Sequence, residues 1–147
     1  MGNQTWLVNQ GSIQKITNQF DNVKILSTHK GEEFLGRTYI TPLIDREVPI
    51  ASASFIDPRH GSGLVYSSPA GSPHDYLGLI EAQAEGRVSK DVVVINTVDT
   101  KDKTGQTIIW DGTCAADAIT KKYGITKSDD PQLEDVKQEL YKQEHYG

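Results

Sequence analysis

The chain has 147 residues, 36% hydrophobic and 24% charged, which predicts one globular domain with its own core and excludes a disordered composition. Its net charge of −5 is the wrong sign for wrapping a nucleic-acid phosphate backbone, although it permits contact with a single nucleic-acid end. The single cysteine excludes an internal disulfide and a multi-thiolate metal site. The sequence also has no apolar run of membrane-spanning length and no signal-peptide pattern, and these features together favour a cytoplasmic protein.

The first part of the chain predicts short strands around one helix. Residues 6–8 form an apolar run, and residues 23–28 are β-branched and apolar between turn-forming residues, so both are expected to be strands. Residues 12–20 carry apolar side chains at helical spacing and are expected to form a short amphipathic helix.

Two further strands are expected at residues 37–41 and 48–56, joined by a polar turn at Asp45 and Arg46. Pro49 cannot donate a ladder hydrogen bond, so it is expected at a strand start or a sheet edge. A turn over residues 57–61 then leads into the central stretch of the chain.

The central stretch, residues 61–76, predicts a glycine turn, the strand 64–68, a short loop and a helix over 73–85. Ser72 suits the N-cap and Pro73 the first helical position. Asp75 stands three residues after the cap, where its carboxylate can reach back to free backbone amides. Gly86 is the expected stop, and Leu77, Ile80 and Ala84 are expected on one helix face.

The remaining sequence predicts two strands followed by two helices. Residues 91–98 and 107–110 are the strands, with a polar hairpin-like loop at 101–106. One helix is expected over 114–123, ending at Gly124, and another after Asp130 and Pro131. Its expected apolar face comprises Leu133, Val136, Leu140 and Tyr141. The predicted fold is mixed α/β, with a small barrel-like mixed sheet core decorated by α-helices.

The residue patterns alone leave the functional residues open. A carboxylate at Asp75 is explained by helix capping, and the alternative is an anchor for a cation such as a substrate ammonium group. Gly61, Ser62 and Gly63 are explained by a tight turn, and Tyr66 by core packing. The four histidines lack metal-ligand spacing, so no metal site is expected.

The central stretch also resembles the editing domain inserted into the large class I aminoacyl-tRNA synthetases. That family carries a glycine-rich turn, a strand, a Pro-Ala or Pro-Gly loop and an Asp-Tyr pair, which stand here as GSG, LVYSS, PAG and DY. The stretches KGEEFLGRTYITPLIDREVPI, FIDPRHGSG, AADAITKKYGI and LEDVKQELYKQEHYG are similar to the archaeal and eukaryotic leucyl type. An editing domain of the isoleucyl or valyl type is the alternative within the family.

The resemblance implies a hydrolytic proofreading domain that removes wrong amino acids from the 3′ end of tRNA-Leu. Asp75 would hold the substrate ammonium group. The pocket for the terminal adenosine and the amino acid would comprise Gly61, Ser62, Gly63, Tyr66, Ser68, Pro69 and Ala70. Selection would act as a second sieve that blocks leucine and admits near-isosteres. Editing would need no metal or cofactor, and ATP would serve only a synthetic domain, whose signatures this chain lacks.

The resemblance further implies that residues 1–147 form a single editing domain excised from a much larger synthetase, with the remainder of that synthetase as a partner. The family's threonine-rich strand, expected just before Gly2, has no counterpart here. The fragment alone is therefore expected to be weakly active or inactive, and a non-catalytic module that binds the tRNA 3′ end is the alternative function. Ser68 and Gly71 replace an apolar residue and a histidine of the family pattern, which predicts a wider or more polar pocket.

Overall fold

The computed structural model describes residues 4–41, 45–89, 99–101, 107–109 and 114–146. The chain divides into two compact units. Unit 1 comprises Met1–Glu33 and Ile56–Tyr66, and unit 2 comprises Phe34–Phe55 and Ser67–Gly147. The short 3₁₀ helix η2, Gly31–Phe34, includes the point in the sequence where unit 1 ends at Glu33 and unit 2 begins at Phe34.

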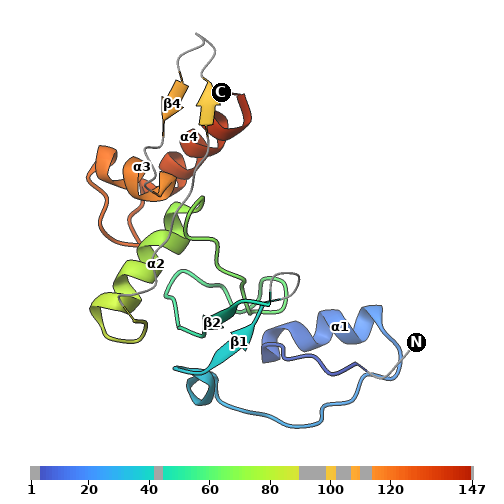
Figure 1. Cartoon of the computed structure of the whole chain (residues 1–147). Helices are drawn as coiled ribbons and strands as arrows, with labels where there is room; N and C mark the ends of the chain where they lie inside the picture. Colours follow the sequence, from blue (N-terminus) through green and yellow to red (C-terminus); the bar gives the residue numbers. More distant parts are fainter. Residues whose placement is uncertain (1–3, 42–44, 90–98, 102–106, 110–113, 147) are drawn as a thin grey trace. The chain divides into compact units, whose positions relative to one another are not determined.

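Unit 1 contains the predicted N-terminal helix in two parts, the 3₁₀ helix η1 (Gln10–Ser12) and the α-helix α1 (Ile13–Gln19), drawn in blue in Figure 1. The Asn9 side chain caps η1 by accepting a hydrogen bond from the Gly11 amide at 2.9 Å. The rings of Trp6 and Phe20 meet edge to face, with centroids 5.1 Å apart. The prediction of a helix over 12–20 is confirmed.

Three predicted strands, at residues 6–8, 23–28 and 64–68, are wrong: these residues belong to none of the strand ladders described. Apart from the half-buried Val8, their apolar side chains are open to solvent, with Ile25 66% and Leu26 73% exposed. A β-branched sequence favours a strand only when neighbouring strands and a covering face pack against it. Within the described residues these segments have no such partner.

Unit 2 begins with a two-stranded antiparallel sheet of β1, Thr38–Ile40, and β2, Glu47–Pro49. Tyr39 is paired with Val48, which confirms the predicted pairing of these two segments. Pro49 ends β2, and both strands of such a pair are edges, as expected for a residue without an amide hydrogen. The predicted strand 48–56 was too long, because regular pairing stops at this proline and the chain turns at residues 54–55.

The core of unit 2 lies between three helices that pack together: α2 (Pro73–Ala84), α3 (Ala115–Tyr123) and α4 (Leu133–Tyr146) (Figure 1). All three were predicted. The buried cluster comprises Leu77, Ala115, Ile119, Ile125, Leu133, Val136 and Leu140, with Tyr76 packed against it. The predicted face of α2 was partly wrong, since Ile80 and Ala84 are exposed while Gly78 and Ala82 are buried. Tyr141 of α4 is likewise 41% exposed.

The residues predicted to cap or end α2 and α3 do so in the structure. Ser72 is the N-cap of α2, and its hydroxyl accepts a hydrogen bond from the Asp75 amide at 3.4 Å. Gly86 after α2 and Gly124 after α3 have φ values of +72° and +69°. Glycine adopts this left-handed conformation without the steric cost that a Cβ brings, and the chain can therefore leave each helix sharply.

The middle of α2 packs against the segment that follows β2. A Cβ added to Gly78 would lie 2.7 Å from Cε1 of Phe55, so the absence of a side chain lets the ring approach the helix. The Phe55 ring also lies 5.7 Å from that of His74. Glu81 accepts hydrogen bonds from the amide and the hydroxyl of Ser128, both at 2.8 Å, and so ties α2 to the turn before α4.

We expect the free energy of unfolding to fall as the pH drops below 6.5, because of His74. Burial, reinforced by the nearby Lys137 charge, lowers the pKa of this imidazole below its ordinary 6.5. The unfolded chain therefore binds a proton at a higher pH than the folded chain, and stability present above 6.5 is lost on acidification. Urea denaturation at several pH values between 7.5 and 5 checks this. A His74→Gln variant should show a shallower fall, and an identical slope would contradict the assignment.

The second sheet is the antiparallel pair of β3, Asp99–Lys101, and β4, Thr107–Ile109, with Thr100 opposite Ile108. This confirms a strand after the polar loop, whereas the predicted strand 91–98 lies outside the described residues. The fold is mixed α/β, as predicted. A barrel-like core is not confirmed, since the described residues form two separate two-stranded sheets and neither is closed. No helix among the described residues is long and apolar enough to cross a membrane.

Candidate functional site

The glycine turn in unit 1 is held by the segment before α1. The Asn9 amide donates to the Ser62 carbonyl at 2.7 Å, and the Gly63 amide donates to the His60 carbonyl at 2.9 Å. Gly63 has a φ of +74°, and a Cβ placed there would lie 2.3 Å from Cβ of Asn9 and 2.8 Å from the Pro58 carbonyl oxygen. Glycine is therefore required at residue 63 by both backbone conformation and space.

The same turn is preceded by a closely paired acid and base. Asp57 accepts hydrogen bonds from the backbone amide of Arg59 at 2.8 Å and from its Nε at 3.0 Å. These bonds lower the pKa of the exposed Asp57 carboxyl to about 2. Asp57 therefore remains a turn-stabilising carboxylate throughout the neutral range.

The predicted pocket residues of this turn differ in exposure. Ser62 and Gly63 are half-buried, whereas Gly61 is exposed with a φ of +55° and open space where a Cβ would stand. Tyr66 is 55% exposed, so the interpretation of this side chain as core packing is wrong. Exposure leaves the Tyr66 ring available for a ligand, which is the role that the resemblance implies.

In unit 2 the predicted anchor, Asp75, holds the loop that precedes its own helix. Its Oδ2 accepts a hydrogen bond from the Ser68 amide at 2.7 Å. The Ser68 carbonyl in turn accepts from the amides of Gly71 and Ser72, at 3.2 and 3.1 Å. The carboxylate does reach back to a free amide, but to one four residues before the N-cap Ser72, and the loop 68–72 is thereby closed into a compact turn.

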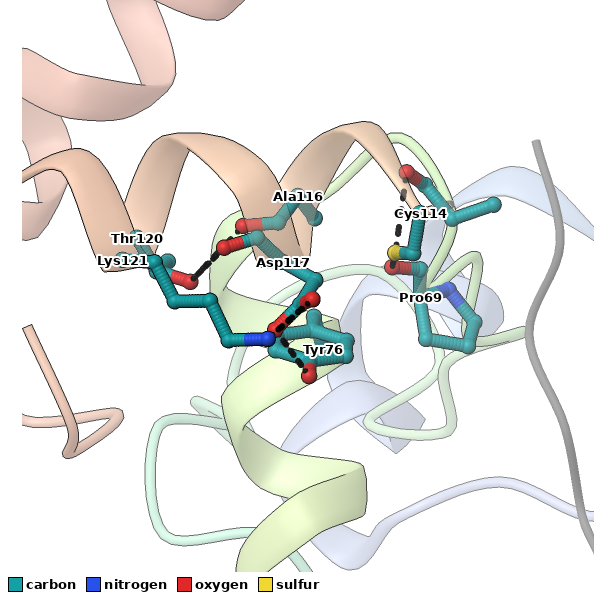
Figure 2. Close-up of polar contacts among 8 residues, drawn as sticks. Pro69, Tyr76, Cys114, Ala116, Asp117, Thr120 and Lys121 are labelled. Atoms are coloured by element: carbon teal, nitrogen blue, oxygen red, sulfur yellow. Dashed lines mark hydrogen bonds and ion pairs between the residues drawn. The ribbon is translucent and has the colours of Figure 1, made fainter. Parts of the chain in front are cut away.

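The start of α3 holds the same loop through two further contacts. The Cys114 thiol donates to the Pro69 carbonyl, with sulfur and oxygen 3.3 Å apart (Figure 2). The Ala116 amide donates to the Ala70 carbonyl at 3.2 Å. Cys114 is buried, as predicted for a small structural residue, and burial raises the pKa of its thiol. Pro69 and Ala70 are therefore placed by α3 as well as by α2.

A third contact joins α2 directly to α3 and was not predicted from the sequence. The hydroxyl of Tyr76 donates to Oδ1 of Asp117 at 2.5 Å, and Nζ of Lys121 lies 2.7 Å from Oδ2 of the same carboxylate (Figure 2). The spacing of Asp117 and Lys121 by four residues is a signal for an ion pair along one helix. No sequence signal links Tyr76 to a residue 41 positions away.

The predicted site residues thus fall into two groups. Ser68, Pro69, Ala70 and Asp75 come together around one loop of unit 2, while Gly61, Ser62, Gly63 and Tyr66 belong to unit 1. Among the described residues, no group of three or more histidine, cysteine or acidic side chains is arranged to hold a metal ion.

The chemistry available at the loop is that of a fixed carboxylate. Asp75 is half-buried in the first turn of α2, where the partial positive charge of the helix N-terminus stabilises an anion. Oδ2 is engaged by Ser68, and within the described part of the chain Oδ1 makes no hydrogen bond. A carboxylate with one oxygen fixed and one available is suited to bind an ammonium group.

Curated relatives match almost the entire chain. A leucine–tRNA ligase from Methanococcus aeolicus is 34% identical over 146 residues, which is 98% of this chain and 14% of that ligase. A leucine–tRNA ligase from Methanopyrus kandleri is 32% identical over 98% of this chain, and one from Methanothermobacter thermautotrophicus is 27% identical over the same share. No family model matches the chain.

These relatives define a class of enzyme, the ligases that join an amino acid to tRNA. Within that class the chain is similar, over nearly its whole length, to a segment of the archaeal leucine–tRNA ligases, which confirms the resemblance predicted from the sequence. The chain spans only 14–16% of the length of these ligases, and it therefore corresponds to one segment of such an enzyme.

Proposed function

We propose that this chain is the post-transfer editing domain of a leucine–tRNA ligase, which hydrolyses the ester of tRNA-Leu mischarged with an amino acid such as isoleucine, methionine or norvaline. The observation that carries the proposal is the Asp75 carboxylate, fixed through Oδ2 by the Ser68 amide with Oδ1 unoccupied by described residues. The match to leucine–tRNA ligases over 98% of the chain supports it. The partners would be the 3′ end of tRNA-Leu and the rest of the ligase, in the cytoplasm.

In this mechanism the chain's own groups bind and orient the substrate. An aminoacyl ester carries a free ammonium group, and Oδ1 of Asp75 would accept a charge-assisted hydrogen bond from it. Holding the ammonium group places the ester carbonyl at a defined distance from an attacking water, which lowers the entropic part of the barrier. Ser68, Pro69 and Ala70 of unit 2 would contact the terminal adenosine and the amino-acid side chain. For unit 1, the substrate contacts that the resemblance implies are Gly61, Ser62, Gly63 and Tyr66.

The proposal includes a structural consequence for the unpaired segments. Residues 23–28 and 64–68 have strand-forming sequences and exposed apolar side chains, including Leu64 at 52% and Val65 at 55%. In the complete ligase these segments would gain strand partners and complete a barrel-like sheet. The isolated chain is expected to deacylate mischarged tRNA weakly or not at all.

A chimeric ligase tests the function without relying on the isolated chain. The segment of the Methanococcus aeolicus ligase that matches this chain is replaced by residues 1–147, and deacylation of isoleucyl-tRNA-Leu is measured beside the unmodified ligase. We expect the chimera to retain deacylation, and leucylation of tRNA-Leu serves as the control for folding.

A chimera that charges tRNA-Leu with leucine but accumulates isoleucyl-tRNA-Leu would contradict the hydrolytic function. The second candidate is a module that binds the tRNA 3′ end without hydrolysis. It predicts that such a chimera still binds the tRNA end as tightly as the unmodified ligase.

A further inference from the structure

The residue after the candidate anchor is fixed by a second helix. Tyr76 follows Asp75 in the first turn of α2, and its hydroxyl donates to Oδ1 of Asp117 on α3 at 2.5 Å (Figure 2). The Asp117 side chain is only 17% exposed, and its other oxygen is held by Lys121 at 2.7 Å. Both carboxylate oxygens are thus engaged, and Asp117 presents a fixed acceptor to Tyr76.

The same turn of α3 also fixes the loop before the anchor. The Ala116 amide and the Cys114 thiol donate to the carbonyls of Ala70 and Pro69, at 3.2 and 3.3 Å. The chain on both sides of Asp75 is therefore attached to α3: the loop through Cys114 and Ala116, and the helix through Tyr76. A shift of α2 against α3 would move the Asp75 carboxylate relative to the Ser68 amide that it holds.

The hydrogen bond from Tyr76 to Asp117 persists across the neutral pH range. Burial and the hydrogen bond to Asp117 both raise the pKa of the Tyr76 hydroxyl above its ordinary value of 10, so this group stays protonated and remains a donor. A hydrogen bond from a phenol to a carboxylate is of the stronger, charge-assisted kind.

We propose that Asp117 is a positioning residue for the candidate site: through Tyr76 it sets the place of Asp75, and so the strength with which the site holds a substrate ammonium group. The inference rests on the proposed function for the identity of the ligand. Asp117 itself does not touch the substrate, since both its oxygens bind Tyr76 and Lys121.

The experiment uses two non-hydrolysable probes, adenosine carrying norvaline through an amide in place of the ester, and the same amide without the α-ammonium group. The dissociation constants of both probes are measured by calorimetry on the 147-residue chain. The constant of the probe without the ammonium group, divided by that of the probe with it, reports the contact of Asp75 with the ammonium group. Asp75→Asn removes the charge and should bring the ratio to about one.

Tyr76→Phe and Asp117→Leu each remove the contact between the helices. We expect each to reduce the ratio about 3- to 10-fold, since roughly 1 kcal/mol of positioning corresponds to about a fivefold change in affinity. Asp117→Asn keeps an oxygen that accepts from the Tyr76 hydroxyl, and should restore most of the ratio. Lys121→Ala is the matched control: it removes the ion pair but not the Tyr76 contact, and should leave the ratio within about twofold.

Hydrogen exchange of the Ser68 amide, followed by NMR, is the second readout. If Asp117 positions Asp75, the exchange of this amide speeds up several-fold in Tyr76→Phe and Asp117→Leu but not in Lys121→Ala. Unchanged Ser68 exchange in the first two variants overturns the positioning role. If the wild-type chain binds the two probes with equal affinity, the ammonium anchor of the proposed function is overturned. The exchange rate of the Ser68 amide then still decides whether Asp117 positions Asp75.

Discussion

Asp75→Ala is expected to slow deacylation of isoleucyl-tRNA-Leu by the chimeric ligase about 10- to 100-fold. A hydrogen bond to a charged group contributes roughly 1.5–3 kcal/mol, and about 1.4 kcal/mol corresponds to a tenfold change. The alanine also leaves the Ser68 amide without the acceptor that it now has at 2.7 Å. Single-turnover deacylation, with leucylation as the folding control, measures the effect.

Asp75→Asn separates the two roles of this side chain. Asparagine keeps a carbonyl oxygen that accepts from the Ser68 amide, and so keeps the loop closed, but it has no charge for an ammonium group. We expect the asparagine variant to lose nearly as much deacylation as the alanine variant. If instead Asp75→Asn edits like the wild type, the carboxylate serves only to hold the loop, and the anchor role is wrong.

The largest effect on stability is expected from Gly63→Ala. Left-handed backbone costs a residue with a Cβ about 1–2 kcal/mol. In addition, the new methyl would stand 2.3 Å from Cβ of Asn9 and 2.8 Å from the Pro58 carbonyl, and overpacking of this kind costs roughly 1–3 kcal/mol. Because the Asn9 contact is to the backbone end of its side chain, it cannot be relieved by rotating a side chain.

Gly61→Ala is the matched control for that prediction. Gly61 lies in the same turn with a φ of +55°, but nothing stands within 4 Å of the added carbon. This variant therefore carries only the backbone cost. Urea denaturation of both variants, with hydrogen exchange of the Asn9 amide that donates to Ser62, reports unit 1 in particular. Equal losses at the two glycines would show that the crowding around Gly63 is relieved and the explanation is wrong.

The helices of unit 2 were predictable because their signals are local. Ser72, Pro73 and Gly86 bracket α2, Gly124 ends α3, and Asp130 accepts the Gln132 amide at 2.9 Å just before α4. Helix caps and terminating glycines act within one or two helical turns, so the sequence alone predicts where these helices begin and end. The burial of Leu133, Val136 and Leu140 likewise follows from helical periodicity.

The strands were harder to predict because their stability depends on partners distant in sequence. The nearby segments Thr38–Ile40 and Glu47–Pro49 pair with each other. Residues 23–28 have an equally strand-like sequence but belong to no ladder among the described residues. The face of α2 was misjudged for a related reason. Gly78 is buried by the Phe55 ring, which approaches because that glycine has no side chain, and helical periodicity carries no information about this contact.

The candidate site was predictable only in part. Local capping chemistry indicated that the Asp75 carboxylate would bind a backbone amide, and it does, although at Ser68 rather than in the first helical turn. The attachment of the loop to α3 had no local signal, because Cys114 and Pro69 are 45 positions apart and the donors are a thiol and a backbone amide. The ligand roles of the eight predicted residues remain predictions.

The buried thiol beneath the loop gives this protein an internal reporter. Cys114 is the only cysteine of the chain, so an alkylating reagent has a single target. The raised pKa keeps that thiol in its unreactive protonated form, and the buried sulfur donates to the carbonyls of Pro69 and Ala70. We therefore expect alkylation to require separation of the loop from α3, so that its rate would report this opening. A ligand that clamps the loop would slow the labelling without any need for turnover.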